Sequence, residues 1–174
     1  MNKRKNTVMV FGTFDILHQG HKHFLKQAKQ YGNFLIVVIA RDVTVKQVKG
    51  KLPDKNEKQR QQAVIKSNLA DKVVLGNLKN KYAVIKKFKP DIICLGYDQE
   101  YFVSQLKSEI NPAPFLEKRC GVKKFQSEAS SRQRTGTAPL VKHIKIIRLK
   151  PYKARKYKTS IIKTQNEKRK MRNN

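Results

Sequence analysis

One segment near the N-terminus constrains the fold and function of this chain more than any other. Residues 12–21 read Gly-Thr-Phe-Asp-Ile-Leu-His-Gln-Gly-His and directly follow an apolar run over 7–11. The apolar residues after the segment repeat at helical spacing, which predicts a helix over about 20–31. A tight loop between a strand and a helix start presents unpaired backbone N–H groups and the positive end of a helix dipole. Such a junction favours phosphate binding.

Two histidines at this junction, His18 and His21, carry side chains that can donate hydrogen bonds to phosphoryl oxygens. The alternatives are a metal site completed by His23, or a plain surface cluster of histidines. The nearby sequence holds no cysteine and, besides Asp15, no acidic residue that would complete a metal shell. We therefore expect an active site that handles phosphate, with no protein-held metal, in which Asp15 caps or braces the loop.

Apolar strand-like runs alternate with helical segments along most of the chain. This alternation predicts an α/β fold: a Rossmann-like, parallel five-stranded sheet with helices on both faces. The ligand site of such a sheet lies outside the carboxyl ends of its strands, so residues 12–21, 40–51 and 96–99 should meet there. The predicted strands cover residues 7–11, 33–41, 72–75, 91–95 and 144–149, and the predicted helices cover 20–31, 56–68, 82–88, 100–110 and a segment from about Thr159.

Individual residues indicate a loop in one part of the chain and the start of a helix in another. The lysine-rich residues 46–53 contain Gly50 and Pro53 and are predicted to form a loop. The helix over 56–68 has Asn56 as its expected N-cap. Its apolar residues Val64 and Ile65 are expected to face inward.

We expect one domain over residues 1–165, interrupted by a mobile insertion at 111–142, and a basic tail at 166–174 that frays. Residues 127–139 contain no large apolar side chain and are dense in Ser, Thr, Gln, Arg and Gly. The insertion therefore lacks a core of its own. Cys94 lies within an apolar run and is expected to be a small core residue rather than a nucleophile.

The net charge of +28 is extreme for 174 residues and is denser after residue 103. A positive field attracts anionic nucleotides and would also attract RNA non-specifically. The plain alternative is a lysine-rich solvated surface. No apolar run is long enough to span a bilayer, and two cysteines do not suggest a disulfide framework, so a cytoplasmic protein is expected.

Residues 13–21, with the His-x-Gly-His pair, resemble the signature of the cytidylyltransferase-like nucleotidyltransferases. That superfamily includes glycerol-3-phosphate cytidylyltransferases, pantetheine-phosphate adenylyltransferases and archaeal-type FAD synthases. The chain departs from the family at Thr159 and Ser160, where relatives usually carry one more small hydroxyl residue, and at the insertion. Further segments similar to the archaeal-type FAD synthases or to the closing segment of the family are 41–45, 49–53, 95–99, 148–152 and 157–162.

The resemblance implies an enzyme in which a substrate phosphate oxygen attacks the α-phosphorus of a nucleoside triphosphate and expels pyrophosphate. His18 and His21 would be catalytic. A Mg²⁺ ion would be held mainly by the triphosphate oxygens. The expected nucleotide-binding residues are Gly12, Thr13, Phe14, Lys22, Asp98, Thr159 and Ser160, and the expected substrate phosphate-binding residues are Lys46, Lys49 and Arg60.

Three functions follow as alternatives. The first is an FAD synthase-like adenylyltransferase that uses ATP and FMN, with Tyr97, Tyr101 and Phe102 offering flat faces to a ring system. The second is a cytidylyltransferase that uses CTP and glycerol 3-phosphate or a similar polyol phosphate. The third is an RNA- or ribosome-associated binding protein on the same scaffold. The charge and fold also leave room for non-specific RNA contact and for a homodimer.

Overall fold

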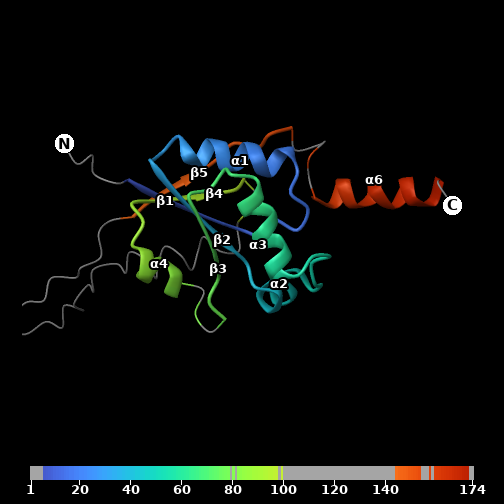
Figure 1. The fold of residues 1–174 in the computed structure, drawn as a ribbon, viewed down its shortest axis with the longest axis horizontal. Coiled ribbons are helices and arrows are strands. Elements are labelled where there is room, and N and C mark those ends of the chain that lie inside the picture. Colours follow the sequence, from blue (N-terminus) through green and yellow to red (C-terminus); the bar gives the residue numbers. More distant parts are fainter. Residues whose placement is uncertain are drawn as a thin grey trace, which may run out of the picture.

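A five-stranded, fully parallel sheet forms the centre of the computed structural model (Figure 1). The structure describes residues 6–78, 80, 82–97, 99, 144–153, 157 and 159–172. The strand order is β3-β2-β1-β4-β5, which confirms the predicted Rossmann-like sheet. The strands are β1 (Thr7–Gly12), β2 (Phe34–Ile39), β3 (Lys72–Leu75), β4 (Ile92–Leu95) and β5 (Lys145–Arg148).

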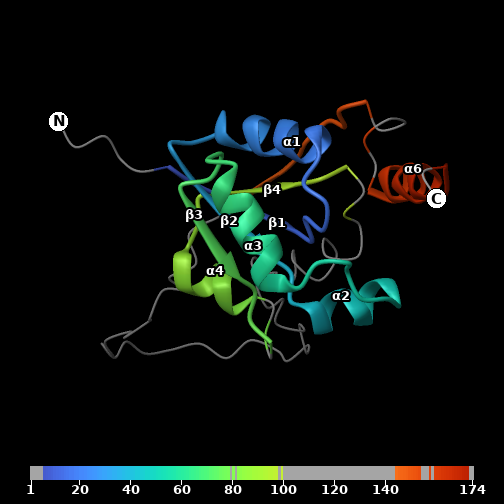
Figure 2. The same ribbon diagram turned by 45° about the vertical axis from the view of Figure 1, so that its right-hand side comes forward.

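Helices cover both faces of this sheet (Figures 1 and 2). Helices α1 and α3 pack on one face and α4 packs on the other. The described helices are α1 (Gln19–Lys29), α2 (Asp42–Lys49), α3 (Glu57–Lys66), α4 (Ala83–Phe88) and α6 (Thr159–Arg172).

The alternation of side chains along β1 shows why the central strands β1 and β2 are almost entirely apolar. Val8 and Val10 are fully buried among residues of α1 and α3. Met9, between them, is fully buried in the second core, against α4. A strand covered on both faces needs apolar residues at odd and even positions alike, which is why the sequence shows continuous apolar runs.

The side of the sheet to which successive strands are added changes between β1 and β4. From β1 the chain passes outward to β2 and β3, then returns to place β4 on the other side of β1. The crossovers that leave these two neighbouring strands run in opposite directions, so a crevice opens at their carboxyl ends. Residues 12–21, which follow β1, therefore lie at the switch point of the sheet.

Two local predictions were wrong. Residues 42–49 form helix α2, so the predicted loop does not begin until Gly50, whose φ of 72° ends the helix in the left-handed region. No helix breaker precedes Gly50 in this segment, so the helix extends to it. Ile65 is 46% exposed rather than inward-facing, because the buried face of α3 carries Arg60 and Val64, one helical turn apart.

The C-terminal part also differs from expectation. Helix α6 continues through Arg172, so most of the segment predicted to fray as a basic tail is helical. Cys94 is fully buried as predicted, and burial raises the pKa of its thiol to about 12. The predicted helix over 100–110 and the insertion at 111–142 lie outside the described residues. Among the residues described, no helix combines the length and apolarity needed to cross a bilayer.

Candidate active site

A cavity of about 700 Å³ opens at the carboxyl ends of the strands. Residues that follow β1, β2 and β4 line it together, which confirms that the three loops predicted to meet do so. Polar side chains of the lining come from the loop after β1, from the segment after β2 and from the C-terminal part of the chain. From the segments after β1, β2 and β4 the lining residues are Gly12, Thr13, Phe14, Asp15, His18, Gly20, His21, Ala40, Thr44, Val45, Gln47, Val48, Lys49, Lys51, Gly96, Tyr97 and Gln99.

The loop after β1 folds tightly around the ring of Phe14. Phe14 has a φ of 51° and is only 2% exposed, so its ring turns back under the loop. A Cβ atom on Gly12 would lie 2.5 Å from Cε2 of that ring, a distance that no side chain tolerates. Glycine at position 12 is therefore required by close packing, and Phe14 in turn supports His21, with its ring centroid 5.2 Å away in an edge-to-face contact.

The rings of His18 and His21 stack side by side in the cavity. Their centroids are 3.8 Å apart and their planes differ by 19°. His18 is the N-cap of α1, where its Nδ1 accepts a hydrogen bond from the backbone N–H of His21 at 3.3 Å. A Cβ atom on Gly20 would lie 3.0 Å from the His18 ring and from the Tyr157 carbonyl, which accounts for the glycine between the histidines.

Hydrogen bonds assign opposite roles to the two neutral rings. Because Nδ1 of His18 accepts a hydrogen bond from the backbone N–H of His21, the neutral ring carries its proton on Nε2 and is a donor there. Nδ1 of His21 donates to the carbonyl of Ile16 at 3.0 Å, since a carbonyl can only accept. The neutral His21 ring therefore has an acceptor at Nε2, which becomes a donor only when the ring is protonated.

Both rings favour the neutral form when no anion is near. Burial lowers the pKa of His18. Burial, and then the charge that would form on His18, lower the pKa of His21 to about 4. The stacked arrangement cannot hold two adjacent positive charges without a compensating anion. A phosphate group beside the rings would supply that compensation.

Asp15 braces the loop as predicted. Its carboxylate accepts hydrogen bonds from the backbone N–H groups of Asp54 (3.2 Å) and Lys55 (3.0 Å). Lys163 of α6 also reaches it, with Nζ 2.6 Å from Oδ2. These contacts join the loop after β1 to the segment before α3 and to the C-terminal helix.

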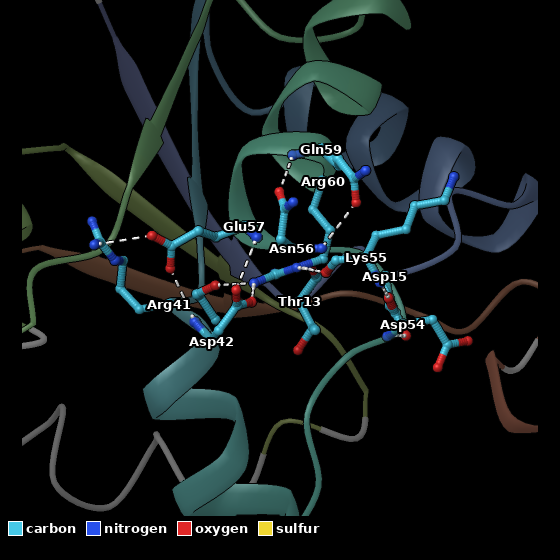
Figure 3. Close-up of polar contacts among 11 residues, drawn as sticks. Thr13, Asp15, Arg41, Asp42, Asp54, Lys55, Asn56, Glu57, Gln59 and Arg60 are labelled. Atoms are coloured by element: carbon cyan, nitrogen blue, oxygen red, sulfur yellow. Dashed lines mark hydrogen bonds and ion pairs between the residues drawn. The ribbon is translucent and has the colours of Figure 1, made fainter.

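Arg60 lies elsewhere than predicted (Figure 3). Its side chain is fully buried and does not line the cavity. Nε donates to the carbonyl of Lys55, Nη1 to that of Thr13, and Nη2 to that of Ala40 and to the carboxylate of Asp42, at 2.5–3.0 Å. With its three nitrogens engaged, the guanidinium is not available to a substrate phosphate, so the predicted phosphate-binding role does not fit.

The remaining predicted residues divide into three groups. Lys49 and Ser160 line the cavity with Gly12, Thr13 and Phe14. Lys22 of α1 and Lys46 of α2 are not among the residues that line it. Asp98 and the side chain of Thr159 lie outside the described part of the structure.

Several lining residues were not predicted. Gly76 and Asn77 follow β3 at the same edge of the sheet, so the rule that selected the other loops would have found them. Lys163 lies one helical turn after Ser160, and that i, i+3 spacing was the available signal. Further examples are Lys51, Lys150, Tyr152 and Tyr157, of which Tyr152 stacks against His23 and Tyr157 with centroid distances of 4.4 and 5.7 Å.

No group of three or more histidine, cysteine or acidic side chains in the described part of the chain has the geometry of a metal site. The carboxylates nearest the histidines are also engaged, since Asp15 and Asp54 both pair with Lys163. The cavity combines paired imidazoles, a helix N-terminus and lysines, which is a set of groups suited to phosphate.

Comparisons with known proteins agree with this geometry. The chain matches the cytidylyltransferase-like family over residues 9–165. It is 38% identical over 124 residues to the FAD synthase of Thermoplasma volcanium, an alignment that covers 71% of this chain and 87% of that protein. FAD synthases of Thermococcus sibiricus and Pyrococcus horikoshii are each 43% identical, over 62% of this chain and 74% and 73% of the relatives.

A solved structure shows the same likeness in three dimensions. The lipopolysaccharide core biosynthesis protein from Thermoplasma volcanium GSS1 superposes with a TM-score of 0.65 and 33% sequence identity. The match covers 86% of this chain and 99% of that one.

Replacing Arg60 by methionine should destabilise the fold strongly. The substitution removes the guanidinium from three backbone carbonyls and from Oδ1 of Asp42, whose carboxylate keeps the backbone N–H of Glu57, at a cost of about 3–5 kcal/mol in the free energy of unfolding. Denaturant unfolding measures the difference. Lys58→Met, at an exposed position on the same helix, is the matched control and should change stability by less than about 0.5 kcal/mol. Equal stability of the two variants would contradict the structural role of Arg60.

The lowered pKa of His21 predicts a pH-dependent stability. Between about pH 4 and 6.5 the unfolded chain binds a proton at this ring that the folded chain does not, so stability falls as the pH falls through this window. This ring contributes a slope of at most about 1.4 kcal/mol per pH unit. Denaturant unfolding across the window should give a shallower slope for His21→Gln than for the unsubstituted protein. Parallel slopes would contradict the assignment.

Proposed function

Since the chain belongs to the cytidylyltransferase-like family, we propose that it transfers the AMP group of ATP to FMN, forming FAD and pyrophosphate. The chain is an FAD synthase-like nucleotidyltransferase by its similarity to several such enzymes, which it covers over most of their length. The choice of ATP and FMN rests on the names of those relatives. A non-specific contact with RNA, a homodimer and a cytoplasmic location stay predictions from the sequence.

The observation that carries the reaction type is the pair of stacked imidazoles at the start of α1, inside the cavity. Transfer of a nucleotidyl group builds negative charge on the oxygens of the α-phosphorus and on the departing pyrophosphate. Donors placed in advance around that charge stabilise the transition state without reorganisation. The helix N-terminus adds its dipole to the same position.

His18 and His21 would share this work unequally. Neutral His18 can donate from Nε2 directly, because its Nδ1 is an acceptor. His21 can donate from Nε2 only as an imidazolium, because its Nδ1 proton is directed to Ile16. A bound triphosphate raises the pKa of a neighbouring imidazole, so the substrate itself would favour the protonated ring.

The acceptor phosphate would attack the α-phosphorus on the side opposite the pyrophosphate. Such a reaction needs little covalent help from the protein, and positioning with charge stabilisation supplies most of the rate. Lys49, Lys51 and Lys150 line the cavity and would neutralise phosphates that enter it. The apolar lining, which includes Tyr97 and Tyr152, suits a flat ring system.

A Mg²⁺ ion would fit this site only as a partner of the triphosphate. The described residues offer no cluster that could cage it, and magnesium commonly relies on phosphate oxygens and water. When bound, the ion would neutralise phosphate charge. The lysines that line the cavity would neutralise the phosphate charge that the ion leaves uncompensated.

The direct test incubates the purified protein with ATP, FMN and Mg²⁺ and measures FAD and pyrophosphate by chromatography. A parallel incubation with CTP and glycerol 3-phosphate tests the cytidylyltransferase alternative. We expect FAD in the first incubation and no CDP-linked product in the second. The reverse outcome would assign the chain to the polyol phosphate enzymes, and no product in either would contradict the proposal.

Removing either imidazole of the pair should slow turnover by about two to three orders of magnitude while the fold survives. The loss of one transition-state donor typically costs roughly 2.7–4 kcal/mol. His18→Ala and His21→Ala are compared with His23→Ala, a histidine on the same helix that does not line the cavity. His23→Ala should retain most of the turnover. Full activity in both cavity variants would refute the assignment.

A further inference from the structure

The ammonium group of Lys163 lies between two carboxylates, one of which belongs to the loop after β1. Its Nζ lies 2.6 Å from Oδ2 of Asp15 and 2.8 Å from Oδ1 of Asp54. The Lys163 side chain is 20% exposed and lines the same cavity as His18 and His21. One positive charge from α6 therefore faces two negative charges from two other segments.

The carboxylate of Asp15 stays ionised in this position. Burial raises its pKa, but the hydrogen bonds from Lys163 and from the backbone N–H groups of Lys55 and Asp54 together hold the pKa below its usual range. The carboxylate is only 7% exposed, so water screens it poorly. The cavity thus contains a permanent negative charge beside the groups that would bind phosphate.

A polyphosphate would be repelled by that charge if it were uncompensated. Like charges a few ångströms apart in a half-buried cavity interact far more strongly than in water. The loop after β1 needs the Asp15 carboxylate, because it binds the backbone N–H groups of residues 54 and 55 and so joins the two segments. A cation held next to Asp15 lets the carboxylate brace the loop and reduces its repulsion of a bound anion.

We propose that Lys163 is a positioning residue whose single positive charge offsets the charge of the buried Asp15 and part of that of the exposed Asp54, so that the cavity accepts a polyphosphate while Asp15 keeps the loop after β1 in place. The inference rests on the proposed function in so far as the natural polyphosphate is a nucleoside triphosphate. It gives helix α6 a second residue that acts at the cavity, one turn after Ser160 and outside the sequence segments that resemble the family.

The first test is binding of inorganic tripolyphosphate, measured by titration calorimetry on the full chain. Lys163→Met should weaken binding by about tenfold or more, since it leaves two carboxylates without their cation. Lys163→Arg, which keeps the charge, should restore most of the affinity. Lys168→Met, an exposed lysine further along α6, removes the same charge from the chain and should leave affinity nearly unchanged.

The second test removes a carboxylate instead of the cation. Asp54 is 60% exposed, and Asp54→Asn should therefore be tolerated by the fold. The double variant Lys163→Met with Asp54→Asn should regain part of the lost affinity, and Asp54→Asn alone should bind tripolyphosphate more tightly than the unsubstituted protein. A purely structural role for Lys163 predicts neither change, and Asp54→Asn remains informative if Lys163→Met does not fold.

A neutral ligand separates electrostatics from a general loss of the site. Binding of adenosine, and of cytidine in parallel, should be almost the same in Lys163→Met and in the unsubstituted protein. Equal loss of tripolyphosphate and nucleoside binding would overturn the inference. So would tripolyphosphate binding that is unaffected by Lys163→Met, or absent from the unsubstituted protein.

These outcomes are independent of the proposed reaction. A protein that forms no FAD but loses tripolyphosphate binding on Lys163→Met would refute the proposed function and keep the inference. If the protein forms FAD, but Lys163→Met binds tripolyphosphate as tightly as the unsubstituted protein, the proposed function is kept and the inference is refuted.

Discussion

The fully buried guanidinium of Arg60 is the interaction on which the geometry of the site depends. A buried charge is tolerated only when it is paired and hydrogen-bonded, and here the nitrogens reach three backbone carbonyls and Asp42. Those carbonyls belong to the loop after β1, the end of β2 and the segment before α3 (Figure 3). The Arg60 side chain thus ties three separate segments together. One of them is the loop that begins at Thr13 and carries the two histidines.

The same end of the sheet shows how a strongly basic protein uses its few carboxylates. Asp42 and Glu57 each accept a hydrogen bond from the first backbone N–H of the other's helix, and each also pairs with an arginine. Asp15 accepts two backbone N–H groups and pairs with Lys163. These acids organise loops while their charges are balanced nearby, so the positive field of the chain is preserved where an anionic substrate would enter.

The sequence predicted the sheet well because its signals are local. Continuous apolar runs identify strands covered on both faces, and the loops at their carboxyl ends must meet whatever their composition. Predictions failed where packing in the folded protein overrode what the nearby sequence indicated. The segment 46–49 looked like a loop, yet it extends α2 to Gly50, and Ile65 looked like core, yet Arg60 and Val64 occupy the buried face of α3. A buried arginine cannot be recognised without its partners, which come from distant parts of the chain.

The sequence by itself determined the class of fold and the placement of the two histidines at a strand-to-helix junction, because each depends on neighbours within a few positions. Only the tertiary structure decided that the imidazoles stack, that Arg60 faces inward and that Lys163 reaches Asp15 across 148 residues. The reason is physical: charge pairing and burial depend on distance in space, and that distance is set by how the whole sheet and its helices pack.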